Sequence, residues 1–321
     1  MKRVFVADSI RSVLLSILLL ISCETWGQQV SDPDFDTKVA RPAYTKQPPR
    51  VLFDEAHANF HTAGGRYKPL AELVSNDGYE VTPNKDKFSR KLLDGYHILV
   101  IANALGADSV KSPEWSTGWF LAGARPAFSE EECDAIRDWV KEGGALLLIS
   151  DHRPFGGAVE TLAQRFNIEV SKGYVFDKAN LDERGIYRND LTFTRKDGGV
   201  TEHPITKGRN EAERINRVMT FVGQSLKGST DSTILLKFAD TAIDRQNLAA
   251  TTREDSVAGR AQAIAMNFGK GRVVMLGEAA MLSAQVGSGG KESSKFGMNF
   301  PGIDNRQLAL NIMHWLSGLL K

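Results

Sequence analysis

The sequence predicts an α/β fold in which helices cover both faces of a mostly parallel sheet. Short apolar runs alternate with helical segments through the first half of the chain, which is the order of βαβ units. Two of these runs, 97–102 and 145–149, are continuously apolar, as expected of strands that are buried on both faces. The second half of the chain adds hairpin elements to this sheet.

The predicted elements begin at residue 51. Residues 51–53 form the first strand, 68–76 a helix that ends before Gly78, and 79–81 a second strand. Ser129 and Glu132 have the spacing of a capping box, and they predict a helix that ends at Gly143 and Gly144. A further helix over 157–166 follows the strand 145–149.

The second half of the chain gives weaker signals. Strand-like fragments occur at 191–193, 218–222 and 233–236. Residues 261–268 and 272–276 flank Gly269-Lys270-Gly271 and predict a β-hairpin. Asp304 is the predicted N-cap of a final helix with apolar residues on one face.

Composition limits the class of protein. The chain has 321 residues, of which 42% are hydrophobic and 25% charged, an ordinary globular composition. Forty basic and 39 acidic side chains leave a formal charge of +1. Because no basic tract stands out, we expect no nucleic-acid partner.

The N-terminus predicts export. Lys2 and Arg3 precede an apolar core at 13–21, which has the form and length of a signal peptide. The following Ser22-Cys23 resembles a bacterial lipoprotein box, with Cys23 as the lipidated first residue of a periplasmic or cell-envelope protein. Cleavage after 25–27 and an uncleaved anchor are the alternatives. In each case the domain lies outside the cytoplasm.

The predicted organisation is a signal peptide over 1–22, a flexible tether over 23–49 and a single domain over 50–321. The tether prediction rests on polar residues and four prolines. Cys133 is the only other cysteine, so we expect no structural disulfide. It falls on the apolar face of a predicted helix, where it would pack as a small apolar residue.

Polar side chains follow four predicted strands at their carboxyl ends, where open parallel sheets bind ligands. The first strand is followed by Asp54, Glu55, His57, Asn59 and His61; the strand 97–102 by Asn103; the strand 145–149 by Ser150, Asp151, His152 and Arg153; and the strand 272–276 by Glu278 and later Gln285. Because these strand ends meet at one sheet edge, we expect a small polar ligand to bind there.

Two chemistries fit this set of residues. In the first, His57 and His152 are acid–base or ligand residues, and Asp151 and Glu278 orient them. Asn59, Asn103 and His61 would then hold the substrate. In the second, a divalent metal takes ligands from His57, His61, Asp151, His152 and Glu278. Ser150 lacks the glycine-flanked elbow of serine hydrolases.

Each of these residues also has a structural interpretation. Asp54 and Glu55 could cap or solvate a loop, and Asp151 could be the N-cap of the next helix. Three other histidines favour structural roles: His97 begins a strand, His203 lies in a turn, and His314 lies among core positions of the last helix.

Four segments resemble an uncharacterised bacterial family of the class I glutamine amidotransferase-like superfamily. They are DEAHANFH at 54–61, DHRPFGGA at 151–158, GEAAM at 277–281 and NIMHWL at 311–316. The segment 203–208 also resembles an element that recurs in that superfamily, including its trehalose-utilisation branch. The resemblance covers roughly residues 50–321. It implies a flavodoxin-like, three-layer α/β sandwich, and it does not supply an activity.

The resemblance also implies where a catalytic cysteine would lie. Glutamine amidotransferases have a cysteine at a sharp turn after a central strand, paired with a histidine and a glutamate. The turn predicted to match it, 149–152, has no cysteine, and Cys133 lies upstream in a helix. We therefore expect no thiol-dependent glutamine hydrolysis.

Two functional hypotheses follow. The first is an exported, hydrolase-like enzyme that acts on a small polar substrate, such as a carbohydrate or a cell-wall derivative. The second is a non-catalytic ligand-binding or scaffold lipoprotein, with a groove lined by Trp115, Trp119 and Phe120. The same three aromatic side chains could also form a packed lid.

Overall fold

The computed structural model describes residues 29–111, 125–183, 190–246, 253–287 and 294–321. Its largest sheet has nine strands. In spatial order eight of them are β3 (Glu80–Asn84), β2 (Arg50–Asp54), β4 (Ile98–Ala102), β5 (Ala145–Ile149), β15 (Gly271–Leu276), β14 (Ala261–Phe268), β10 (Leu226–Lys227) and β6 (Glu169–Val170). The ninth, β11 (Thr233–Lys237), pairs with β14.

The two halves of this sheet differ in strand direction. β3, β2, β4, β5 and β15 are parallel, and their order relative to the chain is 2-1-3-4-5, as in flavodoxin-type sheets. The predicted hairpin joins β14 to β15 through Gly269 and Lys270. From β14 onward every pairing in the sheet is antiparallel. The α/β class is therefore confirmed, but the sheet is mixed rather than mostly parallel.

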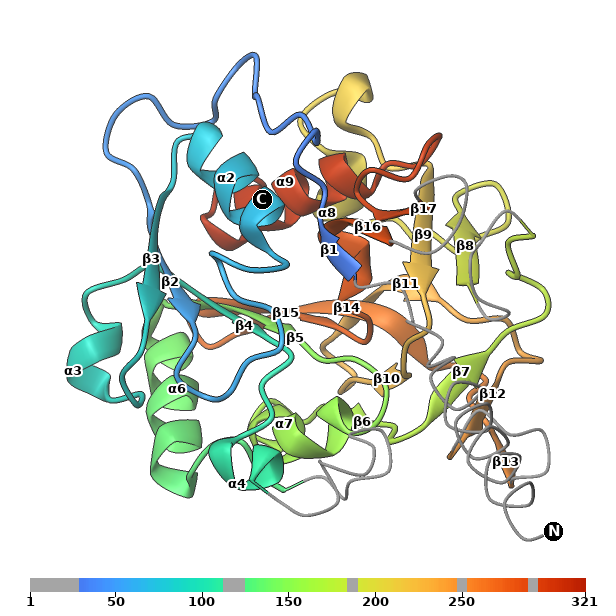
Figure 1. The fold of residues 1–321 in the computed structure, drawn as a ribbon, viewed down its shortest axis with the longest axis horizontal. Helices are drawn as coiled ribbons and strands as arrows, with labels where there is room; N and C mark the ends of the chain where they lie inside the picture. The colour runs from blue at the N-terminus through green and yellow to red at the C-terminus, as the bar shows by residue number, and fades with distance from the viewer. Residues whose placement is uncertain (1–28, 112–124, 184–189, 247–252, 288–293) are drawn as a thin grey trace, which may run out of the picture.

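Helices cover both faces of the parallel half (Figure 1). α2 (Lys68–Asn76) and α9 (Asn305–Leu316) lie on one face, and α3 (Arg90–Leu93), α6 (Glu130–Glu142) and α7 (Phe155–Gln164) lie on the other. Each face of the sheet has its own hydrophobic core: the first core includes side chains of α2 and α9, and the second includes side chains of α6 and α7. In β4, Ile98 and Val100 belong to the first core, whereas Leu99 and Ile101 belong to the second. This alternation buries both faces of the strand and explains why its sequence is continuously apolar.

Smaller elements surround these layers. Three small sheets contain β1 (Gln29–Ser31), β16 (Ala284–Gly287) and β17 (Ser294–Gly297); β13 (Glu254–Ser256), β12 (Ile243–Arg245) and β7 (Tyr174–Phe176); and β8 (Asp190–Thr194) with β9 (Arg217–Phe221). The short helices are α4 (Ala107–Val110), α8 (Pro204–Lys207), η1 (Glu211–Glu213) and η2 (Ala280–Leu282).

The helix caps agree with the sequence in one case and differ in another. At α6 the Ser129 hydroxyl accepts from the Glu132 N–H at 3.3 Å, and a Glu132 oxygen accepts from the Ser129 N–H at 3.0 Å. The predicted capping box is thus confirmed. Asp304 precedes α9 but does not cap it by its side chain. Its carboxylate accepts instead from the N–H groups of Asn216 and Arg217 and ties α9 to β9.

The N-terminal segment differs from its prediction. From residue 29 onward the expected tether lies against the domain: β1 pairs with β16, and the Ala43 N–H donates to Asp77 at 2.8 Å. β1 pairs with β16 through backbone hydrogen bonds, which do not depend on the side chains. The polar, proline-containing sequence therefore did not predict this pairing. The predicted signal peptide, Cys23, Trp115, Trp119 and Phe120 lie outside the described residues.

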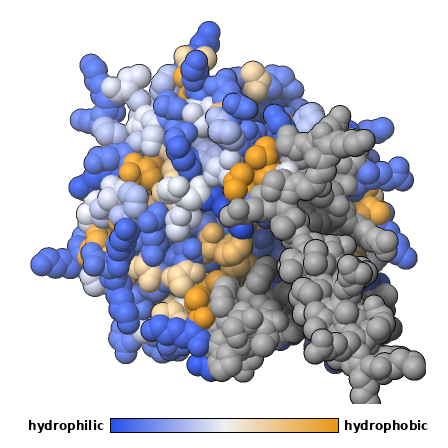
Figure 2. All heavy atoms as spheres, in the orientation of Figure 1, coloured by the Kyte–Doolittle hydropathy of each residue, from blue (hydrophilic) through white to orange (hydrophobic). Residues whose placement is uncertain are grey.

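None of the helices in the described part of the chain has the length and apolar content that crossing a bilayer requires. On the face shown in Figure 2, apolar side chains occur in small groups among mostly hydrophilic ones. Large apolar side chains that stay exposed among the described residues are few, namely Val30, Leu181 and Leu319.

Candidate functional site

His57 lies between two buried carboxylates. It follows β2, and its Nδ1 is 2.9 and 3.0 Å from the two oxygens of Asp54 at the end of that strand. Its Nε2 is 2.9 Å from Oε1 of Glu132, in the first turn of α6. The ring packs between Phe88 and Phe128, with centroids 4.8 and 4.6 Å away. We call Asp54, His57 and Glu132 the His57 triad.

The His57 triad favours a charged imidazolium. Burial opposes the charge, but the hydrogen bonds and charges of Asp54 and Glu132 outweigh it, so the pKa of His57 lies above its ordinary value. Glu132 also accepts from the Phe88 N–H at 3.0 Å. The triad therefore joins the end of β2 to the start of α6 and leaves neither ring nitrogen of His57 without a partner.

This arrangement corrects two expectations from the sequence. Asp151 or Glu278 was expected to orient His57, but Asp54 and Glu132 do so. Asn59 was expected to hold substrate; its amide donates to Asp54 at 3.0 Å, and its Oδ1 accepts from the His57 N–H at 3.1 Å. Asn59 and Asp54 thus stabilise the turn after β2. Glu55 likewise stabilises this turn, by accepting from the Ala63 N–H at 3.0 Å.

A second cluster forms where β4, β5 and β15 end. It contains Asn103 after β4, Asp151 after β5 and Glu278 after β15, and all three are buried. His61 joins it from the loop after β2, with its Nδ1 3.2 Å from the Asn103 amide nitrogen. Asn103 also hydrogen-bonds Asp151. We call these four residues the strand-end cluster.

The negative charge of Asp151 acts on Glu278. Burial raises the pKa of Glu278 well above its ordinary value, and the charge of Asp151 adds to this. Burial also raises the pKa of Asp151, although His152 and the Ala279 N–H oppose the shift. Because β5 and β15 are paired neighbours, the two carboxyl groups lie at adjacent strand ends. Like charges held close together in a buried site favour a shared proton.

Backbone groups hold both carboxyl groups in place. Glu278 accepts from the N–H groups of Ala280 and Met281, the second at 2.7 Å. Asp151 accepts from the His152 N–H at 2.8 Å. Asp151 is therefore not the side-chain cap of the following helix; the N-cap position of α7 is Pro154.

His61 is a neutral member of the strand-end cluster. Burial, and the nearby charge of Arg66, lower its pKa to about 3. Its ring packs edge-on against Tyr67, with centroids 4.6 Å apart. The Tyr67 hydroxyl donates to the carbonyl oxygen of Ala279, next to Glu278. His61 can therefore serve as a hydrogen-bonding group, but not as a cation, near pH 7.

His152 lies half-buried beside the strand-end cluster. Its Nε2 is 3.8 Å from Oδ1 of Asp151, and its Nδ1 is 2.8 Å from the carbonyl oxygen of Arg153. A carbonyl oxygen only accepts, so Nδ1 holds the proton and Nε2 faces Asp151. His152 stacks on Tyr174 with centroids 4.5 Å apart.

Aromatic rings extend from His152 along the same edge. Phe155 lies 6.3 Å from His152 and 5.7 Å from Phe60, centroid to centroid. Tyr174, His152, Phe155 and Phe60 thus form a row of rings, which we call the aromatic row. Sequence analysis gave no role to Tyr174, Phe155 and Phe60, because a lone aromatic residue in a sequence is indistinguishable from a core residue.

Comparison with solved structures finds chains of similar fold. No family model and no curated protein matches this chain. The mmIFT52 N-terminal domain matches with a TM-score of 0.57 and 14% identity, over 84% of this chain and 97% of that one. ThuA-like proteins from Bacteroides uniformis and Parabacteroides merdae match with TM-scores of 0.45 and 0.42, at 14% and 12% identity. They cover 85% and 84% of this chain and 93% and 90% of their own.

The likeness concerns the fold alone. The sequence resemblance pointed to the turn 149–152 as the sharp turn after a central strand, and the structure places a left-handed residue at the end of another strand. The central strand among the five parallel ones is β4, and it ends at Asn103, whose φ of 48° is left-handed. That sharp turn, rather than 149–152, has the strained backbone of a nucleophile elbow. An asparagine amide cannot replace a thiolate as nucleophile.

The proposed metal ligands do not gather. Among the described residues, no three His, Cys, Asp or Glu side chains are placed to hold a metal ion. The His57 triad places His57 with Asp54 and Glu132, apart from the other candidate ligands. We therefore derive no step through a metal.

The remaining histidines and Cys133 have structural partners. His97 Nδ1 accepts from the Arg50 N–H, and His203 accepts from the Ile205 N–H as the N-cap of α8. His314 Nε2 is 2.6 Å from Asp77. Burial raises the pKa of Cys133 to about 12, so this thiol stays protonated at neutral pH and is a poor nucleophile.

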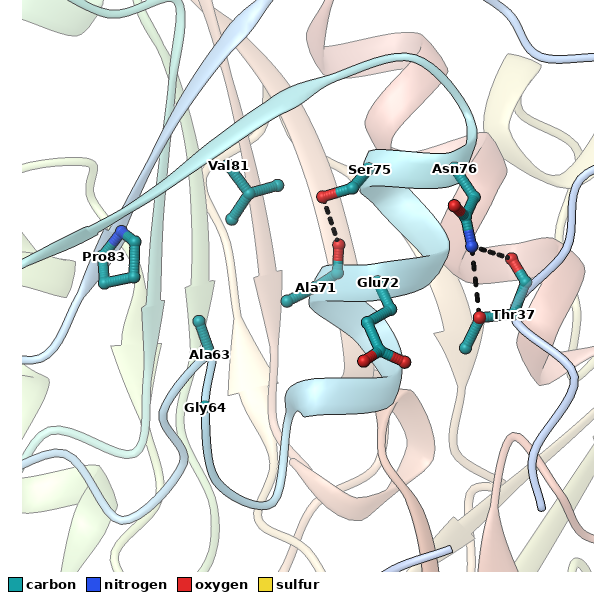
Figure 3. Close-up of a pocket in the computed structure, with 9 residues that line it drawn as sticks. All are labelled: Thr37, Ala63, Gly64, Ala71, Glu72, Ser75, Asn76, Val81 and Pro83. Atoms are coloured by element: carbon teal, nitrogen blue, oxygen red, sulfur yellow. Dashed lines mark hydrogen bonds between the residues drawn. The ribbon is translucent and has the colours of Figure 1, made fainter. Parts of the chain in front are cut away.

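A separate hollow lies on the first-core side of the sheet, beside α2. It has a volume of about 500 Å³ and lies between α2 and the edge strand β3, with Thr37 on its rim (Figure 3). Its lining is small or apolar, apart from Glu72 and a few hydroxyl and amide groups. No histidine lines it, so it does not offer the chemistry of the strand-end cluster.

Proposed function

We propose that the chain is a hydrolase-type enzyme of the cell envelope that acts on a small polar substrate, with His152 and Asp151 as its acid–base pair. The observation that supports this most is the 3.8 Å gap between His152 Nε2 and Asp151 Oδ1. It lies at the carboxyl end of β5, where open α/β sheets bind ligands. The gap is longer than a hydrogen bond, so the oxygen of a water or hydroxyl group can bridge the two atoms.

Each member of the pair has one task. His152 donates from Nδ1 to the Arg153 carbonyl, and Nε2 is the ring nitrogen that would accept a proton from the bridging water. Asp151 has a raised pKa, so it can hold a proton and return it to the leaving group. Glu278 acts through Asp151: it is fully buried, and proton exchange between the two carboxyl groups sets the charge beneath the site.

The aromatic row favours a carbohydrate as substrate. Ring faces stack on the C–H faces of sugars, and the rings here lie beside carboxyl groups, which is the pairing that glycoside hydrolysis uses. Phe60 and His152 are partly exposed, whereas Phe155 and Tyr174 are buried. The Arg66 guanidinium lies 4.1 Å from the Phe60 ring centroid, so a sugar would meet the other face of this ring. The side-chain oxygen Oδ1 of Asn103 is buried and has no hydrogen-bond partner among the described residues. It would accept from a substrate hydroxyl.

The second hypothesis, a non-catalytic ligand-binding protein, has one observation in its favour. Both oxygens of Glu278 accept backbone N–H groups, and His57 is engaged at both nitrogens. Two of the four residues expected to be catalytic are thus held by the protein itself. A ligand pocket would need only the hydrogen-bonding groups of Asn103 and His61.

The experiment is a substrate panel with matched variants. Purified full chain is assayed on 4-nitrophenyl glycosides and 4-nitrophenyl esters. We expect turnover of at least one glycoside, with kcat/KM falling by about 10²–10⁴-fold in His152→Ala, the usual range for a general acid or base. Lys270→Ala, an exposed side chain in the turn between β14 and β15, should leave the rate unchanged. Turnover that survives His152→Ala would refute the acid–base role, and sugar binding without turnover would favour the second hypothesis.

We also propose that residues 1–22 direct export and that Cys23 receives the lipid that anchors the chain to a membrane. The support is the sequence pattern of charge, apolar core and cysteine.

A further inference from the structure

A second hollow lies at the opposite edge of the sheet from the strand-end cluster. It has a volume of about 310 Å³ and lies near the amino ends of β2, β4 and β5. Its lining includes Tyr44, Gln47, Tyr96, His97, Trp139 and Gly144. We call it the amino-edge hollow. Nothing in the proposed function uses it.

Trp139 forms a fixed wall of the amino-edge hollow. It lies in the last turns of α6 and is only 4% exposed. A Cβ at Gly144 would lie 2.3 Å from the indole ring, so the ring rests directly on the glycine backbone. Tyr44 is held as well, because its hydroxyl donates to Ser317 at 3.0 Å and its ring packs edge-on against Tyr79. The walls are thus preformed, which lowers the entropic cost of binding.

The hollow also offers hydrogen-bond donors. His97 Nδ1 accepts from the Arg50 N–H at 3.0 Å, so the His97 proton is on Nε2, on an exposed side chain. No described residue accepts a hydrogen bond from the indole N–H of Trp139. Gln47 adds an exposed amide. These donors would bind a ligand that has many oxygen acceptors.

The charge of the lining residues and the volume of the hollow limit the class of ligand further. None of the described residues that line the hollow is Asp, Glu, Lys or Arg. A charged group near the lining is the Arg50 guanidinium, 6.0 Å from the centroid of the Tyr96 ring, and the lining itself suits a neutral ligand. A volume of about 310 Å³ is at the small end of ligand pockets, which span roughly 300–1,000 Å³. Aromatic walls with hydrogen-bond donors at the rim, no charge and room for one ring match a neutral sugar.

We infer that the amino-edge hollow is a binding site for a single neutral sugar unit, separate from the strand-end cluster. A sugar ring would lie against Trp139 and Tyr96, and its hydroxyl oxygens would accept from Trp139 Nε1 and His97 Nε2. A proline-rich peptide also binds aromatic grooves, but a left-handed proline helix advances about 3.1 Å per residue and needs a longer groove.

The test follows the indole N–H signal of Trp139 by NMR in the full chain, with Trp139→Phe used to assign it. Glucose, galactose, mannose and N-acetylglucosamine are titrated singly. We expect a saturating shift of this signal with at least one sugar. Tyr96→Ala should weaken binding about tenfold through loss of ring contact, whereas His152→Ala should leave it unchanged.

Three outcomes of the titrations with wild type and Tyr96→Ala would overturn the inference. They are no shift with any of the four sugars, a shift that persists at full affinity in Tyr96→Ala, and a shift produced only by a proline-rich peptide. If Trp139→Phe does not fold, binding to Tyr96→Ala and wild type is compared by calorimetry instead. Loss of binding in His152→Ala would place the sugar at the strand-end cluster, and so would refute this site while supporting the proposed function.

Discussion

Replacing His57 by alanine tests whether the His57 triad is structural. The substitution leaves Asp54, with no exposed surface, and Glu132, 4% exposed, without the cation between them. Two contacts of 2.9 Å are lost at once. Removing one partner of a buried ion pair costs about 3–5 kcal/mol. Without His57, one of the two carboxylates can take up a proton, which limits the loss of unfolding free energy to that range. At roughly 2 °C per kcal/mol for a chain of this size, Tm should fall by about 6–10 °C.

The pH dependence of this loss has a definite sign. The raised pKa of His57 means that its stabilisation is fully present below its ordinary value of 6.5 and is lost as pH rises through the folded value. The lowered pKa of Glu132 means that its stabilisation is present above its ordinary 4.5 and is lost as pH falls. The difference in unfolding free energy between wild type and His57→Ala should therefore be largest near pH 5.5 and smaller near pH 8.5.

The assay is urea unfolding at both pH values, followed by tryptophan fluorescence. His97→Ala is the matched control, because it removes an exposed histidine with one hydrogen bond, and it should cost no more than about 1 kcal/mol. The structural role would be refuted if His57→Ala were as stable as His97→Ala, or if its deficit grew from pH 5.5 to 8.5.

Three further predictions concern other parts of the chain. Gly144→Ala places a methyl group against the Trp139 ring and should cost about 1–3 kcal/mol of unfolding free energy; an unchanged urea midpoint would contradict it. Cys23→Ser should move the protein from the membrane fraction to the soluble fraction of the producing cells; unchanged fractionation would rule out the lipid anchor. Cys133 is buried with a raised pKa, so a thiol reagent should label it only in denaturant, and labelling in the native state would contradict the packing described.

The sequence predicted the strand-end cluster because the rule for it is simple. Residues that follow parallel strands meet at one edge, so Asn103, Asp151 and Glu278 could be grouped without knowing the pairing of their strands. His57 also follows a parallel strand, but it lies in the His57 triad and not in the strand-end cluster. Its partner Glu132 lies 75 residues away in sequence. A capping box uses one carboxylate oxygen of its glutamate, and the sequence does not show that the other oxygen contacts His57.

The second half of the chain was harder to predict for a physical reason. β10 and β6 have two residues each, too few for any periodicity to register. The antiparallel strands that make the sheet mixed are set by tertiary pairing. The N-terminal segment shows the same limit, since β1 contributes backbone hydrogen bonds to β16 while its side chains carry no pattern of their own.

The coupling between Asp151 and Glu278 is the central claim, because the acid–base proposal depends on a carboxyl group that can hold a proton near neutral pH. Carbon-detected NMR of labelled glutamate and aspartate side chains measures it directly, in wild type and in Asp151→Asn. The account predicts that Glu278 titrates well above 4.5 in wild type. It also predicts that Asp151→Asn lowers this pKa, since one negative neighbour is gone. A Glu278 that titrates near 4.5, or whose pKa does not move in Asp151→Asn, would contradict the account.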